Sequence, residues 1–498
     1  MIPIALVAAL TASIAHADSV AGTRSELLVE RSHDIALTMH YGHAELVVRR
    51  TVWNGGERHD QAMFWIDVPE GAVAVGLRTL GELHGRPHWF DGELLEAELA
   101  AARYQELTGI GGYYPKDPAL LSWRSRWQLA LQVFPCAPQA PKTIEYTMVI
   151  PTSYEDGRYR VTLPRIGTDT LRATAKLHAA SARDQIFVDG LPVGRGDVLE
   201  LGDQHELALA RAAAPALEGA LAMVALGDDR ALFHYDFEAG REISKLPRKA
   251  DVVVLVDRSR SIDDETIAAE LVAARGYLSH FAAAKLQARA AVVAFDRKPE
   301  DLLHGFAPVG EATALLEHTT LAAKNGSHVD AALEHATKLF EDAPAGRARR
   351  IVLFTDRATR SAMTVARVQA IAERTGAIVH LADVVPSGEN VLERDDADAW
   401  SPIAEATGGV SWHLTVDAEG RDLSERSRVL EELARPLRLH ALAVRAPGVP
   451  DAALDLPETL DEGAAITQLL LTDGPVPHVV VTGELWSEPV RKVILPDD

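Results

Sequence analysis

The sequence contains almost no cysteine, which excludes several ways of stabilising a protein or building a redox site. Its 498 residues include a single cysteine, Cys136. One thiol cannot form an internal disulfide, a Cys-rich zinc site or a CxxC redox motif. We therefore expect Cys136 to be a small buried apolar residue, and the chain to depend on hydrophobic cores for its stability.

Basic residues are scarce relative to acidic ones. The chain has 50 Lys and Arg against 72 Asp and Glu, which gives a formal net charge of −22. General nucleic-acid binding is excluded, because it requires positive charge that neutralises phosphates. Hydrophobic residues make up 47% of the sequence, as in ordinary globular proteins, so the acidic charge does not indicate a disordered tail. The length suggests about three domains.

Long hydrophobic runs are missing beyond the N-terminus, and so are several well-known catalytic motifs. No later stretch approaches the roughly 18 consecutive apolar residues that cross a bilayer, and we find no HExxH, GxSxG or GxxxxGK[ST] motif. Residues 1–17 are apolar and end in Ala15-His16-Ala17, the small-x-small pattern of a signal peptidase site. We therefore expect a signal peptide at 1–17, with a buried strand as the alternative, and an exported protein that is periplasmic, secreted or associated with the cell surface.

Residues 27–163 have the pattern of a β-rich domain. Runs typical of strands at 45–52 and 62–68 flank Asn54-Gly55-Gly56, which predicts a tight hairpin. A helical periodicity follows at 91–107, and alternating strands follow at 127–134 and 143–150. We expect Trp123 and Trp127 to lie in a core or a domain interface. Short β-like segments continue through a connecting region at 164–249 and return in a C-terminal β segment at 436–498.

Residues 250–435 alternate between buried strands and helices. Strands are expected at 251–256, 289–295, 350–355, 377–383 and 410–414, and helices at 263–283, 329–340, 361–375, 402–406 and 423–433. This alternation predicts βαβ units wound around a parallel sheet, an α/β doubly wound fold. Ligands of such folds bind at the carboxyl ends of the strands, so functional residues should follow the strands directly.

Five oxygen-bearing side chains stand at those positions. Asp257, Ser259 and Ser261 form a DxSxS pattern after the first strand, Ser327 precedes a helix, and Asp356 follows a later strand. Carboxylate and hydroxyl oxygens are hard ligands, which suit Mg²⁺ or Ca²⁺ and also Mn²⁺. Each residue taken alone has a simpler explanation, because Asp and Ser after a strand often cap the next helix.

Residues 250 to about 415 resemble a von Willebrand factor type A domain. Its metal-ion-dependent adhesion site (MIDAS) uses DxSxS, a Thr from a second loop and an Asp after a later strand, and the five residues above match that pattern with Ser327 in the place of the Thr. The resemblance implies a divalent cation whose coordination sphere is completed by an acidic side chain of a partner. Arg260, Arg357 and Asn325 stand where the family usually has Gly, and we expect Arg258, Arg260 and Arg357 to add positive charge around the ion.

The N-terminal region has a resemblance of its own. Residues 27–155 are similar to the vault-protein and inter-alpha-trypsin (VIT) domain, in segments at 45–54, 64–69, 101–104, 117–121, 133–135 and 144–146. The region from residue 436 resembles the β segment after the A domain of inter-alpha-trypsin inhibitor heavy chains. The DPHF-type motif by which those chains join glycosaminoglycan is missing, so covalent matrix linkage is not implied.

These inferences together predict an exported, non-enzymatic, multi-domain protein with a signal peptide at 1–17, a VIT-like β-rich domain at 27–163, a β-rich connecting region at 164–249, a von Willebrand A-like domain at 250–435 and a C-terminal β segment at 436–498. Its predicted function is adhesion-type binding of an acidic protein partner through a cation at the MIDAS. Two alternatives stay open: a metal-dependent hydrolase that uses the same oxygens to activate water, and a scaffold whose A domain holds no metal.

Overall fold

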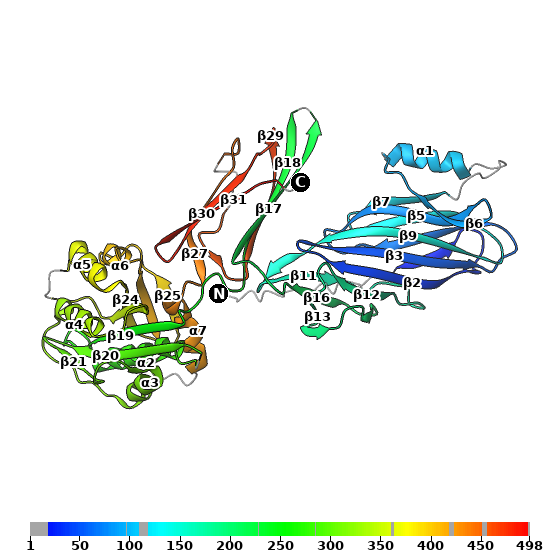
Figure 1. Ribbon diagram of the computed structural model, residues 1–498. Helices are drawn as coiled ribbons and strands as arrows, with labels where there is room; N and C mark the ends of the chain where they lie inside the picture. The colour runs from blue at the N-terminus through cyan, green and yellow to red at the C-terminus, as the bar shows by residue number, and fades with distance from the viewer. Residues whose placement is uncertain are drawn as a thin grey trace, which may run out of the picture. The chain divides into compact units, whose positions relative to one another are not determined.

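The structure, a computed structural model, describes residues 18–95, 97–108, 118–227, 229–283, 285–359, 363–417, 423–450 and 456–496. The predicted signal peptide at 1–17 lies outside the described residues. The chain divides into two compact units, Met1–Ala214 and Pro215–Asp498 (Figure 1). In the part of the chain that is described, no helix is long and apolar enough to cross a membrane.

The first unit consists mainly of antiparallel sheets. Its largest sheet has seven strands, and its long central strands alternate buried and less buried residues, as expected for sheets that pack on one face. The strands in sheet order are β15 (Val198–Glu200), β12 (Thr174–Ala179), β2 (Leu28–Met39), β3 (His43–Asn54), β9 (Ala140–Pro151), β5 (Val73–Leu83) and β6 (Arg86–Asp91). The predicted β-rich character of this region is confirmed.

Two smaller sheets complete this unit. The four-stranded sheet runs β1 (Ser19–Gly22), β4 (Asp60–Asp67), β8 (Gln128–Cys136) and β7 (Ala119–Ser125), and the five-stranded sheet runs β10 (Ser153–Glu155), β11 (Arg158–Leu163), β16 (His205–Ala210), β13 (Gln185–Val188) and β14 (Leu191–Val193). All three sheets contribute to one hydrophobic core, which includes Cys136 as predicted. The predicted helix at 91–107 is α1 (Ala97–Thr108).

Two local predictions in this unit need correction, the second only in its core alternative. Asn54-Gly55-Gly56 does not close a hairpin, because β3 pairs with β2 and β9 whereas β4 pairs with β1 and β8. The turn instead carries the chain from one sheet to another, and the Asn54 amide holds it by donating to the carbonyl oxygens of Arg58 and Cys136 at 2.8 and 2.9 Å. Trp123 and Trp127 are not core residues, because they lie at the edge strand β7 and the turn after it and are 48% and 45% exposed.

A cluster of buried charges ties the start of the described chain to this core. The Arg50 guanidinium, fully buried, donates to the Asp18 carboxylate at 3.0 Å and to both carboxylate oxygens of Glu30 at 2.6 and 2.8 Å. The guanidinium also lies over the ring of Phe64, 4.7 Å from its centroid. Burial raises the pKa of Asp18 to about 6, although the Arg50 charge opposes this shift.

The predicted connecting region at 164–249 is not a separate part of the molecule. Its first part supplies β12 to β16 and core residues such as Leu177 and Leu207 to the first unit. Its later part forms β17 (Leu217–Gly227) and β18 (Arg230–Ala239), which belong to the second unit. Strand periodicity locates such segments but does not say which sheet they join, so the boundary moves to residues 214 and 215.

The second unit contains the predicted α/β doubly wound fold. Its sheet follows the order β21 (Pro299–Asp301), β20 (Gln287–Phe295), β19 (Lys249–Asp257), β23 (Ala348–Phe354), β24 (Ala377–Pro386), β26 (Ser411–Val416) and β25 (Val391–Arg394), with β22 (Ala307–Pro308) also paired to β20. The pairs β20–β19, β19–β23, β23–β24 and β24–β26 are all parallel. The carboxyl ends of these strands therefore meet at one edge of the sheet.

Helices cover both faces of this sheet (Figure 1). Alternate residues of β19 separate the two cores: Val252 and Val254 pack with α2 (Asp264–Ser279), α3 (Val309–His318) and α7 (Leu423–Ala434), whereas Val253 and Leu255 pack with α4 (Val329–Glu341), α5 (Val365–Thr375) and α6 (Ser401–Glu405). This is the reason why the strand is continuously apolar. The predicted helices are confirmed to within a few residues, and α3 is an addition.

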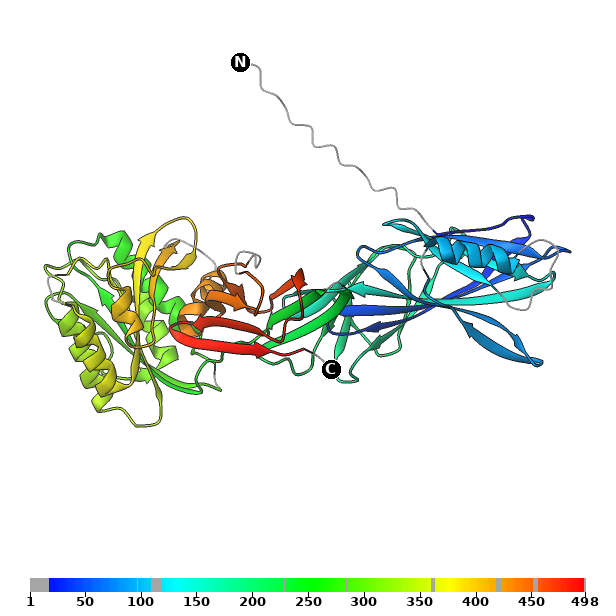
Figure 2. The same ribbon diagram turned by 90° about the horizontal axis from the view of Figure 1, so that it is seen from above.

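The β strands on either side of the α/β part belong together. β17 and β18 precede it, and β29 (Ala465–Asp473) follows it, yet these three strands form one antiparallel sheet. A four-stranded sheet of β28 (Leu460–Asp461), β27 (Arg438–Arg445), β30 (Val479–Leu485) and β31 (Glu488–Ile494) shares their core. Figure 2 shows the C-terminal strands beside the green β17–β18 hairpin. The expected C-terminal β segment is therefore not separate, and the α/β part is an insertion in a β domain.

Candidate metal site

The first strand of the α/β sheet ends in Asp257, whose carboxylate is the centre of the candidate site. Asp257 is fully buried. One of its oxygens accepts the backbone N–H of Ser259 at 2.8 Å, and the other accepts the Ser327 hydroxyl at 3.0 Å. The Ser259 and Ser261 hydroxyls lie 2.8 Å apart, and Ser261 is exposed. Four of the five predicted site residues are thus joined by direct contacts.

The fifth predicted residue, Asp356, lies at the same edge of the sheet. It follows β23, which pairs with β19, and it is half-buried. Its Oδ1 accepts the backbone N–H of Ala358 at 2.9 Å, which fixes the turn that leaves the strand. No hydrogen bond or ion pair joins Asp356 to the other four residues in the described part of the chain, so its part in a shared site rests on its placement.

Hydrogen bonds between loops hold this edge together. The backbone N–H of Lys324 donates to the Arg258 carbonyl oxygen at 2.7 Å, and Lys324 forms an isolated β-bridge with Ser259. From the other side, the Thr359 hydroxyl donates to the Ser327 carbonyl oxygen at 2.9 Å. The loops after β19 and β23 are therefore both anchored to the loop that carries Ser327.

One site residue was missed by sequence reasoning. Thr355 follows β23, is fully buried, and donates its hydroxyl to Asp257 Oδ2 at 2.7 Å. The same hydroxyl accepts the backbone N–H of Arg357 at 3.1 Å. The sequence could have indicated Thr355, because it follows an apolar strand and the ends of neighbouring parallel strands lie side by side.

The electrostatics of this edge disfavour an isolated negative charge. Burial raises the pKa of Asp257, while hydrogen bonds from Thr355, Ser259 and Ser327 oppose the shift. Near Asp257 lies Glu270 of α2, which is fully buried and accepts no hydrogen bond of ordinary geometry from any described residue, although the backbone N–H of Asp257 is close enough to oppose the shift of its pKa. Burial raises the pKa of Glu270 well above its ordinary value, and the charges of Asp257 and Asp356 raise it further. A positive charge here would relieve this repulsion.

Two of the arginines expected to surround an ion with positive charge are neutralised instead. Arg258 is buried and pairs with Asp296 at 2.9 Å and with Glu300. Arg357, at φ 61°, pairs with Asp395 at 3.5 Å and with Asp398. Their acidic partners are distant in sequence, so the motif alone did not reveal them. Arg260, by contrast, is exposed.

The donor set decides which metals could fit. Within the described residues, no group of three or more His, Cys, Asp or Glu side chains is arranged to hold a metal ion. A cation at this edge would therefore depend on hydroxyl as well as carboxylate oxygens, which suits Mg²⁺ or Ca²⁺ better than zinc. The residues brought together around Asp257 fit such an ion in chemical type.

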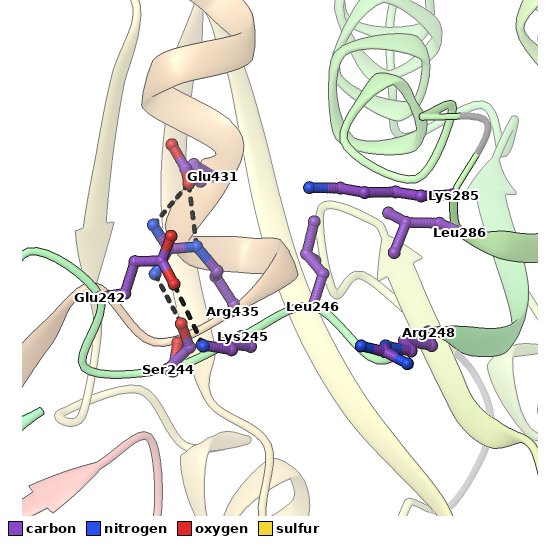
Figure 3. Close-up of a pocket in the computed structure, with 9 residues that line it drawn as sticks. All are labelled: Glu242, Ser244, Lys245, Leu246, Arg248, Lys285, Leu286, Glu431 and Arg435. Atoms are coloured by element: carbon purple, nitrogen blue, oxygen red, sulfur yellow. Dashed lines mark hydrogen bonds and ion pairs between the residues drawn. The ribbon is translucent and has the colours of Figure 1, made fainter. Parts of the chain in front are cut away.

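A separate cavity of about 610 Å³ lies at the opposite, amino edge of the sheet (Figure 3). It is lined by Arg248, just before β19, by Leu286, just before β20, and by residues of the preceding segment and of α7. Its charged groups are largely paired, since Arg435 donates to both Glu431 and Glu462. None of the predicted site residues lines this cavity.

Comparison with known families agrees with the fold of the α/β part. Residues 252–358 match the von Willebrand factor type A domain family. The chain contains a von Willebrand factor type A domain. The matched region includes Asp257, Ser259, Ser261, Ser327 and Asp356. No curated protein sequence matches the chain.

Solved structures similar to part of the chain include bacterial proteins. The conserved hypothetical protein BatB from Bacteroides thetaiotaomicron is 20% identical, with 37% of this chain and 97% of that chain covered and a TM-score of 0.27. The vWF domain of the type V pili tip protein Mfa5 from Porphyromonas gingivalis is 12% identical, with 38% and 95% covered and a TM-score of 0.28. The pilus adhesin SpaC from Lactobacillus rhamnosus GG is 11% identical, with 56% and 47% covered and a TM-score of 0.30.

Proposed function

We propose that this protein binds a protein partner through a divalent cation at the carboxyl edge of the von Willebrand A sheet. Ser259, Ser261 and Ser327 would hold the ion, with Asp257 and Asp356 as direct or water-mediated ligands. The observation that carries the proposal is the Asp257 carboxylate, which gathers hydroxyl groups from separate loops at the strand end. The ion would be Mg²⁺ or Ca²⁺, with Mn²⁺ as a third candidate.

The charge balance explains why the partner should be acidic. When bound, the cation would supply an electrophilic centre for an incoming oxygen ligand, since two aspartates only balance its double charge. Ser261 is exposed, so a partner side chain can reach the edge where the hydroxyls meet. Von Willebrand A domains commonly mediate protein interactions, which supports a binding role over an enzymatic one.

The remaining parts of the proposal concern the whole chain. We propose that the protein is exported, with residues 1–17 removed as a signal peptide, and that the β-rich first unit contains a VIT-like domain in an inter-alpha-trypsin-like arrangement. The small-x-small pattern at 15–17 supports the first point. The antiparallel sheets of the first unit are compatible with the second.

Calorimetric titration of the full-length protein with Mg²⁺, Ca²⁺ and Mn²⁺ tests the proposal. We expect one cation site in the wild type, which Asp257→Ala and Ser259→Ala weaken or abolish. Asp342→Ala is the matched control, because Asp342 is an exposed aspartate at the end of α4 and should leave binding unchanged. No binding in the wild type would contradict the mechanism and favour a metal-free scaffold. Cation-dependent turnover of phosphoesters or peptides would favour the hydrolase.

A further inference from the structure

Four basic residues stand on loops at one side of the candidate site, and we call them the basic collar: Arg260, Arg297, Lys298 and Lys324. All four side chains are exposed. Arg297 and Lys298 form the tip of the β20–β21 turn, where both backbone N–H groups donate to the Asp296 carboxylate, at 2.5 and 3.3 Å. The other two lie on the loops that carry Ser259 and Ser327.

Specific contacts place the collar beside the site. The Arg297 side chain lies against Gly326, the residue before Ser327, where an added Cβ would be 2.7 Å from Arg297 Cγ. Gly326 also has a φ of 92°, which favours glycine. The backbone N–H of His328 donates to the Asp296 carbonyl oxygen at 2.9 Å. The β20–β21 turn is therefore packed against the Ser327 loop.

The positive charge of the collar is largely uncompensated. The nearby acids Asp296 and Glu300 pair with the buried Arg258. Lys324 lies 3.5 Å from Glu300, but Arg260, Arg297 and Lys298 form no ion pair with any described residue. Unpaired positive charge in one place is notable in a chain with a net charge of −22.

Negative charge also lies next to the site, at the start of α2. The acidic residues Asp263, Asp264 and Glu265 begin α2 directly after Ser261. A ligand that approaches the edge therefore meets positive charge on the collar side and negative charge on the helix side. Such an arrangement orients a charged partner, because complementary potentials fix its register.

We propose that the basic collar binds acidic residues that neighbour the metal-bound side chain, so that the partner is a short acidic peptide segment with several carboxylates. This inference rests on the proposed function. Alternate residues of an extended peptide face the same side about 6.6 Å apart, so one carboxylate can reach the ion while others reach the collar. A long polyanion fits less well, because the acidic residues at the start of α2 would repel it.

Fluorescence anisotropy with two labelled peptides tests this inference on the full-length protein in Mg²⁺. One probe is hexaglutamate, and the other is a Gly/Ser hexapeptide with a single Glu. We expect hexaglutamate to bind at least about tenfold more tightly. The double variant Arg297→Glu/Lys298→Glu should remove most of this preference, while the affinity for the single-Glu peptide changes by less than about threefold.

A matched control separates the collar from overall charge. Arg248→Glu/Lys285→Glu makes the same change in net charge at the opposite edge of the sheet, where both residues line the cavity of Figure 3. This control should keep the preference for hexaglutamate. Equal loss in both double variants would overturn the inference, because it would reflect net charge alone.

The outcomes distinguish this inference from the proposed function. If the wild type binds Mg²⁺ and both peptides with EDTA sensitivity, but the collar variant binds hexaglutamate equally well, the collar inference is wrong and the proposed function stands. If calorimetry detects no cation binding, the proposed function fails. If heparin binds in preference to hexaglutamate and the collar variant abolishes that binding, the partner is a sulfated glycan and the peptide inference is overturned.

Discussion

Replacing Glu270 by methionine should stabilise the second unit in the absence of divalent cations. The Glu270 side chain on α2 is fully buried, and its oxygens accept no hydrogen bond of ordinary geometry from any described residue; the backbone N–H of Asp257 is close enough only to oppose part of the rise in its pKa. Its neighbours Asp257 and Asp356 are both acidic. Methionine has a similar length and no polar group that needs a hydrogen bond. Glu270→Met therefore removes the free-energy cost of burying an unsatisfied carboxyl group without opening a large cavity.

The expected gain follows from the cost of an unsatisfied buried polar group, about 1–3 kcal/mol. At roughly 2–4 °C for each kcal/mol in a domain of this size, the melting temperature should rise by roughly 2–12 °C. Urea denaturation of the full-length protein in EDTA measures the free energy of unfolding directly.

Glu373→Met is the control for this measurement. Glu373 is an exposed residue of α5, so its replacement should change the free energy of unfolding by no more than about 0.5 kcal/mol. A loss of stability in Glu270→Met of 1 kcal/mol or more, roughly the worth of a satisfied buried hydrogen bond, would refute the reasoning. It would mean that the buried carboxylate has a favourable partner in the folded protein.

Three further predictions concern other buried polar groups. Thr355→Val keeps the shape of the side chain but removes the hydrogen bond to Asp257, so we expect a loss of about 1–2 kcal/mol in urea denaturation and weaker Mg²⁺ binding by calorimetry; unchanged values in both assays would contradict the assigned role. Arg50→Met leaves two buried carboxylates unpaired and should destabilise the first unit by about 3–5 kcal/mol, measured in the same way; a stability equal to wild type would show that the ion pairs contribute little. Burial lowers the pKa of His380 from its ordinary 6.5 to about 3. The neutral histidine therefore contributes fully to the stability of the folded protein above pH 6.5, and this stability is lost as the pH falls from 6.5 toward 3. Acidification from pH 7 to 5 should therefore lower the free energy of unfolding of the wild type by about 2 kcal/mol more than that of His380→Asn. If the free energies of unfolding of the two proteins fall in parallel with pH, this histidine is excluded as the cause.

The α/β part was predictable because its signals are local. An apolar run such as 251–256 can be a strand only if both faces are covered, and the helical periods between such runs supply the cover. Parallel strands then bring their carboxyl ends to one edge whatever the loops between them. For that reason Asp257, Ser259, Ser261 and Ser327 could be grouped from sequence, and the structure joins them by contacts.

The features that the sequence did not predict depend on contacts between residues that are distant in sequence. The motif placed Arg258 beside the site, but its neutralisation by Asp296 depends on the fold of a turn 38 residues away. Similarly, the turn residues at Asn54 were recognised, yet the sheet that the chain enters next is decided by pairing with β1 and β8. Strand periodicity carries no information on such pairings, and the metal and the VIT-like identity stay predictions.

The insertion of the α/β part in a β domain has a consequence for synthesis on the ribosome. The β17–β18 hairpin emerges early, but the free edge of β18 pairs with β29 only after the whole α/β part has been translated. The α/β core is also incomplete until Trp486 is translated, because this residue packs into the core and donates to the Glu432 carbonyl oxygen at 3.0 Å. Neither half of the second unit can complete its folding until the last strands have left the ribosome, so nascent chains should expose both an apolar core and an open sheet edge to chaperones.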